Sequence, residues 1–132
     1  MAGLSSWGGS GGGGVEGAYL ADASEPLTGT PYHQAEADDG NSGASKTLDW
    51  GANAHRKLTV TDDCELTFTA PSGPANLTLK LVNGGSQTIT WPASVLWAGG
   101  TEPTLTASGT DIVCFYFDGT NYHGAAAVTD SQ

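Results

Sequence analysis

The stretch RKLTVTDDCELTFTAPSGPANLTLKLV, residues 56–82, decides the fold class. Apolar side chains recur at every second position along three of its segments, and mostly polar side chains fill the positions between. The positions that share the inward faces are Arg56, Leu58 and Val60; Cys64, Leu66 and Phe68; and Leu77, Leu79 and Leu81. A period of two is typical of strands with one buried face, so we expect half-buried strands of antiparallel sheets.

The composition divides the chain in two. Residues 1–45 contain 11 of the 20 glycines and six acids but no Lys or Arg, whereas residues 46–132 hold all four basic residues and eight acids. Glycine-rich segments with few apolar residues cannot bury enough surface to fold alone. We therefore predict a Gly-rich acidic N-terminal arm over 1–45, which serves as anchor or linker, and a β-sandwich domain over 46–132. Trp7, Tyr19 and Leu20 are the candidate anchors of the arm, and a solvated linker is the alternative.

Outward from the deciding stretch, the strand Ile112–Phe117 carries apolar side chains on both faces. Such a strand is covered on both sides, and either the arm or an adjacent subunit could supply the second cover. Asn83-Gly84 and Asp118-Gly119 predict hairpin turns, and helical periodicity is absent. The expected fold is all-β, an antiparallel β-sandwich or jelly-roll-like domain of roughly seven to nine short strands, preceded by the extended arm.

The charge balance limits the classes of partner. A net charge of −10 argues against nucleic-acid binding, because counterion release from phosphates needs Lys and Arg. The sequence has no apolar run of membrane-spanning length and no signal peptide at its start, so we expect neither membrane insertion nor secretion. Without secretion, Cys64 and Cys114 are expected to be buried, reduced thiols rather than a disulfide.

The segment QTITWPASVLWAGGTEPTL, residues 87–105, holds the most distinctive motif. Trp91 and Trp97 flank a proline-containing turn, and a Gly-Gly-Thr-x-Pro turn follows. We expect the two tryptophans to pack in the core and its turns, because each buries a large surface. The motif residues are Trp91, Pro92, Trp97, Gly99, Gly100 and Pro103. The alternative is an exposed aromatic site in which Trp97, Tyr122 and His123 face a ligand such as a sugar.

This motif resembles a module found repeatedly in structural proteins of tailed bacteriophages, often in tail fibres and other appendages. The resemblance covers roughly residues 46–125 and includes TLDWG, LTVT, LTFTAP, the Trp-Pro motif, GGTEPTL and DIVCFYFDGTNYHG. It implies a virion structural protein assembled in the host cytoplasm, with capsid or tail proteins as partners and a homotrimer as the common state. The short chain favours a small capsid-decoration or fibre-type protein that attaches by its arm and projects the β-domain outward.

The second functional reading is a tail-tip or tail-fibre receptor-binding module that recognises host surface glycans. An enzyme is not expected, since no catalytic residues come with the resemblance and the adjacent Asp62 and Asp63 would point to opposite faces of a strand. No cofactor is expected. The three histidines are too scattered for a metal site, and the acidic clusters lack the ligand spacing of a calcium loop.

Overall fold

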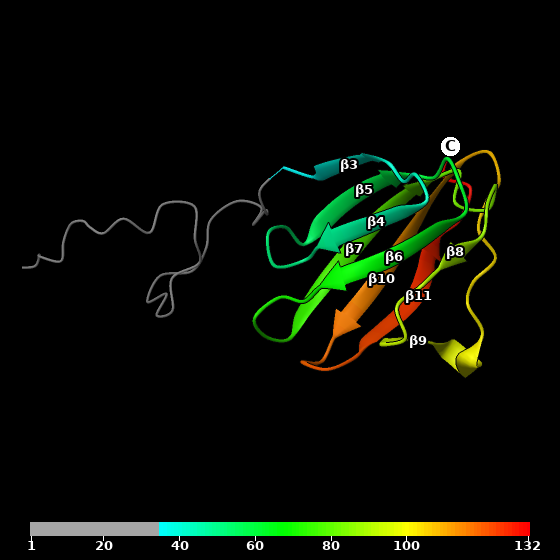
Figure 1. The fold of residues 1–132 in the computed structure, drawn as a ribbon. Coiled ribbons are helices and arrows are strands. Elements are labelled where there is room, and N and C mark those ends of the chain that lie inside the picture. The colour runs from blue at the N-terminus through cyan, green and yellow to red at the C-terminus, as the bar shows by residue number, and fades with distance from the viewer. Residues whose placement is uncertain (1–34) are drawn as a thin grey trace, which may run out of the picture. The chain divides into compact units, whose positions relative to one another are not determined.

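A computed structural model describes residues 35–132 of the chain. These residues form nine strands and one short 3₁₀ turn, η1 (Ala98–Gly100) (Figure 1). The strands are β3 (Ala37–Asn41), β4 (Ser45–Asp49), β5 (His55–Thr59), β6 (Cys64–Thr69), β7 (Ala75–Val82), β8 (Ile89–Thr90), β9 (Val95–Trp97), β10 (Thr110–Phe117) and β11 (Tyr122–Val128). The expected all-β class is confirmed.

From β3 to β8 the chain passes back and forth between two sheets. The six-stranded sheet has the order β3-β5-β7-β10-β11-β9, and the three-stranded sheet has the order β4-β6-β8 (Figure 1). Along this part of the chain each strand pairs in parallel with the strand two places further on. Ser45 pairs with Glu65 and Cys64 with Ile89, so one coil takes roughly 20 to 25 residues. This arrangement of stacked parallel coils is a β-solenoid.

The expected antiparallel pairing is therefore wrong for β3 to β8. Among residues 35–132, antiparallel pairing is confined to β7 with β10 and β10 with β11. The two sheets face each other across one core, but their connections are those of a solenoid rather than of a jelly roll. A strand with one buried face shows the same alternation whichever way its neighbour runs, so the pattern established the faces and left the direction open.

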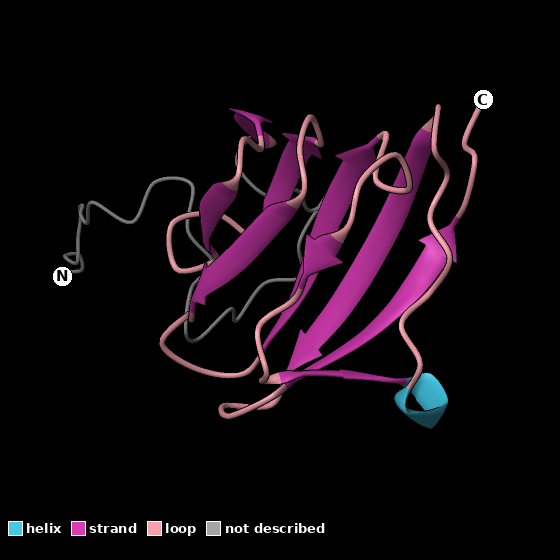
Figure 2. Cartoon of the chain, turned by 45° about the vertical axis from the view of Figure 1, so that its right-hand side comes forward, coloured by secondary structure: helices cyan, strands magenta, loops and turns pink. Residues whose placement is uncertain are grey.

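The last strands end the solenoid. β10 runs antiparallel beside β7 and places Phe115 opposite Leu77, β11 returns beside β10, and β9 pairs in parallel with β11. Figure 2 shows η1 as the cyan turn next to β9, which is the edge strand of the six-stranded sheet. The six-stranded sheet is thus parallel from β3 to β7, antiparallel from β7 through β10 to β11, and parallel again at its β9 edge.

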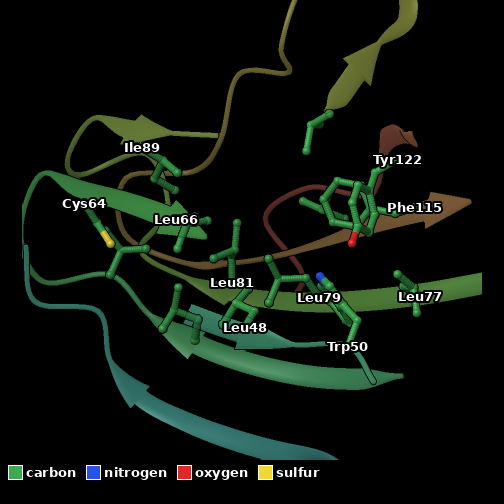
Figure 3. Packing of buried hydrophobic residues seen from close by; sticks show 14 of the residues in the cluster. Leu48, Trp50, Cys64, Leu66, Leu77, Leu79, Leu81, Ile89, Phe115 and Tyr122 are labelled. Atoms are coloured by element: carbon green, nitrogen blue, oxygen red, sulfur yellow. The ribbon is translucent and has the colours of Figure 1, made fainter. Parts of the chain in front are cut away.

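The inward positions of both sheets form a single hydrophobic core. Its buried members are Leu48, Trp50, Leu58, Val60, Cys64, Leu66, Leu77, Leu79, Leu81, Ile89, Val95, Val113, Phe115, Phe117 and Tyr122. Figure 3 shows Leu66 and Ile89 of the three-stranded sheet in the same interior as Leu79 and Leu81 of the six-stranded one. The inward faces predicted for residues 56–82 are confirmed, with Phe68 half-buried and the other positions buried.

Charged groups hold β3 in place, since its sequence ADDGN contains no large apolar residue. Arg56 is only 6% exposed, and its Nη1 donates to Asp39 Oδ1 at 2.8 Å. Its Nε and Nη2 both donate to the backbone carbonyl of Asp49 at the end of β4. A second ion pair, between Lys80 and Glu36, spans 3.1 Å. The guanidinium of Arg56 therefore joins β3, β4 and β5.

This attachment moves the start of the β unit. The chain divides between Tyr32 and His33, and β3 pairs with β5, so the unit begins before the boundary at residue 46 that composition suggested. The glycine and acid content of residues 37–45 resembles that of the preceding residues. Composition could not separate them, because ion pairs rather than apolar burial fix this strand.

The two predicted hairpin turns have different outcomes. Asp118-Gly119 lies in the turn between β10 and β11, where Phe117 pairs with Tyr122 and Gly119 has a φ of 104°. This hairpin is confirmed. Asn83-Gly84 instead carries the chain from β7 in one sheet to β8 in the other. Asn83 adopts a φ of 59°, and its side-chain oxygen accepts from the backbone N–H of Gly109, so the turn is fixed by a distant segment.

A buried carboxylate secures the closing strands. Asp111 is fully buried, and it accepts hydrogen bonds from the backbone N–H groups of Thr106 and Asp130 and from the Thr106 hydroxyl. Burial alone would raise the pKa of Asp111, but these hydrogen bonds lower it overall. The carboxylate thus ties the segment before β10 to the segment after β11.

Replacing Arg56 tests the attachment of β3. Arg56→Ala should lower the free energy of unfolding by about 3 to 5 kcal/mol, because the Asp39 carboxylate loses its ion-pair partner and the Asp49 carbonyl loses two of its donors. Urea unfolding followed by tryptophan fluorescence measures the change. Lys57→Ala, at the next position of β5, should change stability by no more than about 0.5 kcal/mol. A loss below about 1 kcal/mol for Arg56→Ala would contradict the assigned role.

Candidate functional site

The two motif tryptophans pack against the core, as expected. Trp91 and Trp97 are half-buried and meet edge to face, with ring centroids 5.1 Å apart and planes at 78°. Phe115 lies within 6.0 Å of Trp91 and 5.8 Å of Trp97. Phe68 extends the cluster from the opposite sheet, with its ring 6.4 Å from Trp91. Aromatic pairs in this geometry add stabilisation beyond the area that they bury.

The remaining motif residues direct the backbone. Gly99 and Gly100 have positive φ values of 65° and 76°, which glycine adopts easily, and they let the chain turn sharply after Trp97. The carbonyl of Pro92 accepts a hydrogen bond from Val95, which closes the turn before β9. Pro103 lines a shallow groove described below. The tryptophans of the motif therefore serve packing, and Pro92, Gly99 and Gly100 direct the chain.

Trp97 can pack directly against β11 because the residue that it pairs with there, Gly124, has no side chain. A Cβ added at Gly124 would lie 2.6 Å from Cζ3 of Trp97 and 2.9 Å from the ring of Phe115. Side-chain carbons do not approach so closely, so the absence of a side chain at Gly124 allows the two rings to rest on β11.

The three residues predicted to face a ligand do not lie together. Tyr122 is only 3% exposed and packs on Phe117 and Phe68, with burial raising the pKa of its hydroxyl. Its assignment as a ligand-facing residue is therefore wrong. Trp97 is half-buried in the aromatic cluster, and only His123 is exposed. Neighbouring residues of a strand point to opposite faces, which already separates Tyr122 from His123.

His123 belongs instead to an exposed row across three strands. Leu96 of β9 pairs with His123, and His123 pairs with Tyr116 of β10. The rings of Tyr116 and His123 are stacked, with centroids 6.4 Å apart and planes at 28°. Tyr116 is 49% exposed and Leu96 is 44% exposed. Tyr116 was not among the ligand-facing residues expected from the sequence. The alternation along the strand nevertheless put Tyr116 on the same face as Ile112 and Cys114, and Phe115 on the other face.

Asp118 fixes the end of this row. Its carboxylate accepts from the backbone N–H groups of Thr120 and Asn121, and its Oδ2 lies 2.8 Å from Nε2 of His123. The backbone donor of Asn121, then His123 and Thr120, lower the pKa of Asp118 to about 2. Because the pKa of Asp118 is lower in the folded chain than in the unfolded chain, its ionised carboxylate stabilises the fold at pH values above the ordinary pKa of an aspartate. This contribution is lost as the pH falls through about 2.

A shallow groove of about 210 Å³ lies elsewhere, beside β8. Its lining residues are Gly84, Gly85, Gln87, Thr88, Ile89, Glu102, Pro103 and Leu105. Glu102 is the one ionisable side chain among them. A single carboxylate in an open groove supplies neither a nucleophile with its base nor a pair of carboxylates for acid–base chemistry.

Other expectations concern ions, membranes and the arm. Within residues 35–132 no group of three or more His, Cys, Asp or Glu side chains could hold a metal ion. Both cysteines are free thiols; Cys64 is buried, which raises its pKa, and Cys114 is half-buried. No helix in the described part is long and apolar enough to cross a membrane. The proposed anchors Trp7, Tyr19 and Leu20 lie outside the described residues.

A scan against protein-family models, a search of curated proteins and a search of solved structures produced no match.

The contact between Trp97 and β11 can be tested with a single methyl group. Gly124→Ala should lower the free energy of unfolding by about 1 to 3 kcal/mol, because the new Cβ overlaps the Trp97 and Phe115 rings. Gly73→Ala is the matched control, since nothing lies within 4 Å of its added Cβ, and it should be neutral within about 1 kcal/mol. Thermal unfolding of both variants measures the difference, and equal melting temperatures would contradict the tight packing.

Proposed function

We propose that the chain is a structural protein of a tailed-bacteriophage particle, of the capsid-decoration or fibre type. Residues 1–32, which precede the β unit, attach it to capsid or tail proteins, and the β unit projects outward as part of a homotrimer. The observation that carries this proposal is the use of the motif from Trp91 to Pro103. Its tryptophans pack and its glycines turn the chain, which supports the kind of structural role that the resemblance to phage appendage modules implies.

The solenoid suits such a structural role. Its coils stack through in-register contacts, with Leu48 beside Phe68 and Leu58 beside Leu81, so stability accumulates from one coil to the next. Among the described residues, exposed apolar side chains stand on an open sheet face, and the groove beside β8 is shallow. Several copies that each carry one attachment segment would bind a particle with higher avidity than a single copy.

Removing the attachment segment tests the proposal. Deletion of residues 2–20, which include Trp7, Tyr19 and Leu20, should abolish incorporation of the chain into phage particles while the β unit remains folded. Gradient-purified particles probed with an antibody to the β unit measure incorporation, and circular dichroism of the purified variant measures folding. Thr67→Ala, on the exposed face of β6, is the control that should incorporate normally. Normal incorporation of the deletion variant would overturn the attachment role.

A second candidate function is recognition of host surface glycans by a tail-tip or tail-fibre module. The exposed Tyr116 ring, stacked on His123 beside the Asp118 carboxylate, supports it, because an aromatic face next to polar groups can bind a sugar ring. The site differs from the one expected from sequence, since Tyr116 takes the place of Tyr122 and Trp97.

Glycan binding predicts a specific loss in one variant. On a glycan array, the full-length protein should bind defined sugars, and Tyr116→Ala should reduce the apparent affinity at least about tenfold while Thr67→Ala leaves it unchanged. Absence of binding by the unmodified protein, or equal binding by Tyr116→Ala, would remove this second function.

A further inference from the structure

Four exposed side chains form a row across the strands that close the solenoid. Asn76 of β7 pairs with Tyr116 of β10, which pairs with His123 of β11. His123 in turn pairs with Leu96 of β9. Asn76 and His123 are exposed, and Tyr116 and Leu96 are 49% and 44% exposed. We name these four residues, together with Asp118 beside His123 in the hairpin turn, the outer row.

Core packing does not account for the Tyr116 ring. Its neighbours Phe115 and Phe117 point into the core, whereas Tyr116 points away from it. Within residues 35–132 the one ring in contact with Tyr116 is that of His123, at 6.4 Å and 28°, and the neighbour on the other strand is Asn76, which has no ring. The face of an aromatic ring is negative and attracts the C–H groups that line one face of a pyranose. An exposed ring in this setting is suited to a sugar.

Asp118 supplies a fixed hydrogen-bond acceptor at the same end of the sheet. Its Oδ1 accepts from the backbone N–H groups of Thr120 and Asn121, and its Oδ2 lies 2.8 Å from Nε2 of His123. The Asp118 side chain is 35% exposed, and each carboxylate oxygen can accept two hydrogen bonds, so Oδ2 retains capacity for a ligand hydroxyl. Because the hairpin already holds this carboxylate in place, binding costs little further loss of side-chain freedom.

The charges of the chain favour a neutral sugar over an acidic one. The net charge is −10. The lysines on the outward side of the six-stranded sheet have acids beside them, since Lys80 pairs with Glu36 at 3.1 Å and Lys57 lies opposite Asp38. An acidic glycan would bring a second negative charge to the ionised Asp118, whereas the hydroxyl groups of a neutral sugar donate to it.

We propose that the outer row binds a neutral pyranose sugar, with Tyr116 against its C–H face and with Asp118 and His123 hydrogen-bonded to its hydroxyl groups. The inference rests on the second candidate function, glycan recognition, and narrows its ligand to uncharged sugars. Asn76 adds an amide at one end of the row, and Leu96 adds an apolar contact at the other. One sugar covers little area on an open face, so a single site binds weakly and several copies on one particle bind through avidity.

A glycan array that carries both neutral and acidic glycans tests the proposal with the full-length protein. The glycans bound should contain neutral pyranoses. For one such glycan, titration should show that Asp118→Asn weakens binding at least about tenfold, because an NH₂ group replaces the Oδ2 acceptor while an oxygen remains for Thr120 and Asn121. Asp62→Asn is the matched control: it removes the same charge at an exposed position between β5 and β6 and should leave binding intact.

Tyr116→Phe separates the ring from its hydroxyl and should bind about as well as the unmodified protein. Circular dichroism checks that every variant is folded. Binding confined to acidic glycans, or equal binding by Asp118→Asn and Asp62→Asn, would overturn the assignment while glycan recognition itself remained. Absence of binding to any glycan would remove the second candidate function as well. Incorporation into particles is measured separately, so none of these results decides the proposed virion role.

Discussion

A buried guanidinium holds together the part of the solenoid that apolar contacts cannot. Arg56 occupies an inward position beside Leu79, and it satisfies its donors with the Asp49 carbonyl and the Asp39 carboxylate. Without these bonds β3, a strand of polar residues, has little apolar surface to bury against β5. At the closing strands the buried charge is negative: the Asp111 carboxylate accepts hydrogen bonds from N–H and O–H donors. Two charges of opposite sign, each with its own partners, thus delimit an apolar interior.

The parts of the fold that follow from local pattern could be predicted, and the parts that depend on distant segments could not. Alternation gave the inward faces of β5, β6 and β7 because a period of two fixes which side chains share a face. It could not give the direction of pairing. Asn83-Gly84 and Asp118-Gly119 are similar turn signals, but only the second makes a hairpin. Asn83 is held by Gly109, far along the chain, and the strand that follows pairs with β6 in the other sheet.

The candidate site shows that two neighbouring residues of one strand cannot both face a ligand, because their side chains point to opposite faces of the sheet. Tyr122 and His123 are neighbours on β11, so one had to point inward, and the aromatic cluster of Phe68, Phe115 and Phe117 takes Tyr122. The exposed partner of His123 is Tyr116, which comes from the adjacent strand and is visible only once the hairpin register is known. The core role of Trp97 could be predicted from its size, whereas its contact with Gly124 required the parallel pairing of β9 with β11.

The pairing of β7 with β10 also affects how the chain folds while it is being translated. The parallel coils from β3 to β8 can stack as they are synthesised, because each pairs with a coil already made. β7 lacks its other neighbour until β10 has been translated, some thirty residues later. During that interval a nascent chain exposes the edge of an apolar strand with the sequence ANLTLKLV, and unpaired edges of this kind invite aggregation. The outward Lys80 in the middle of β7 provides a charge that opposes edge-to-edge association until the sheet is complete.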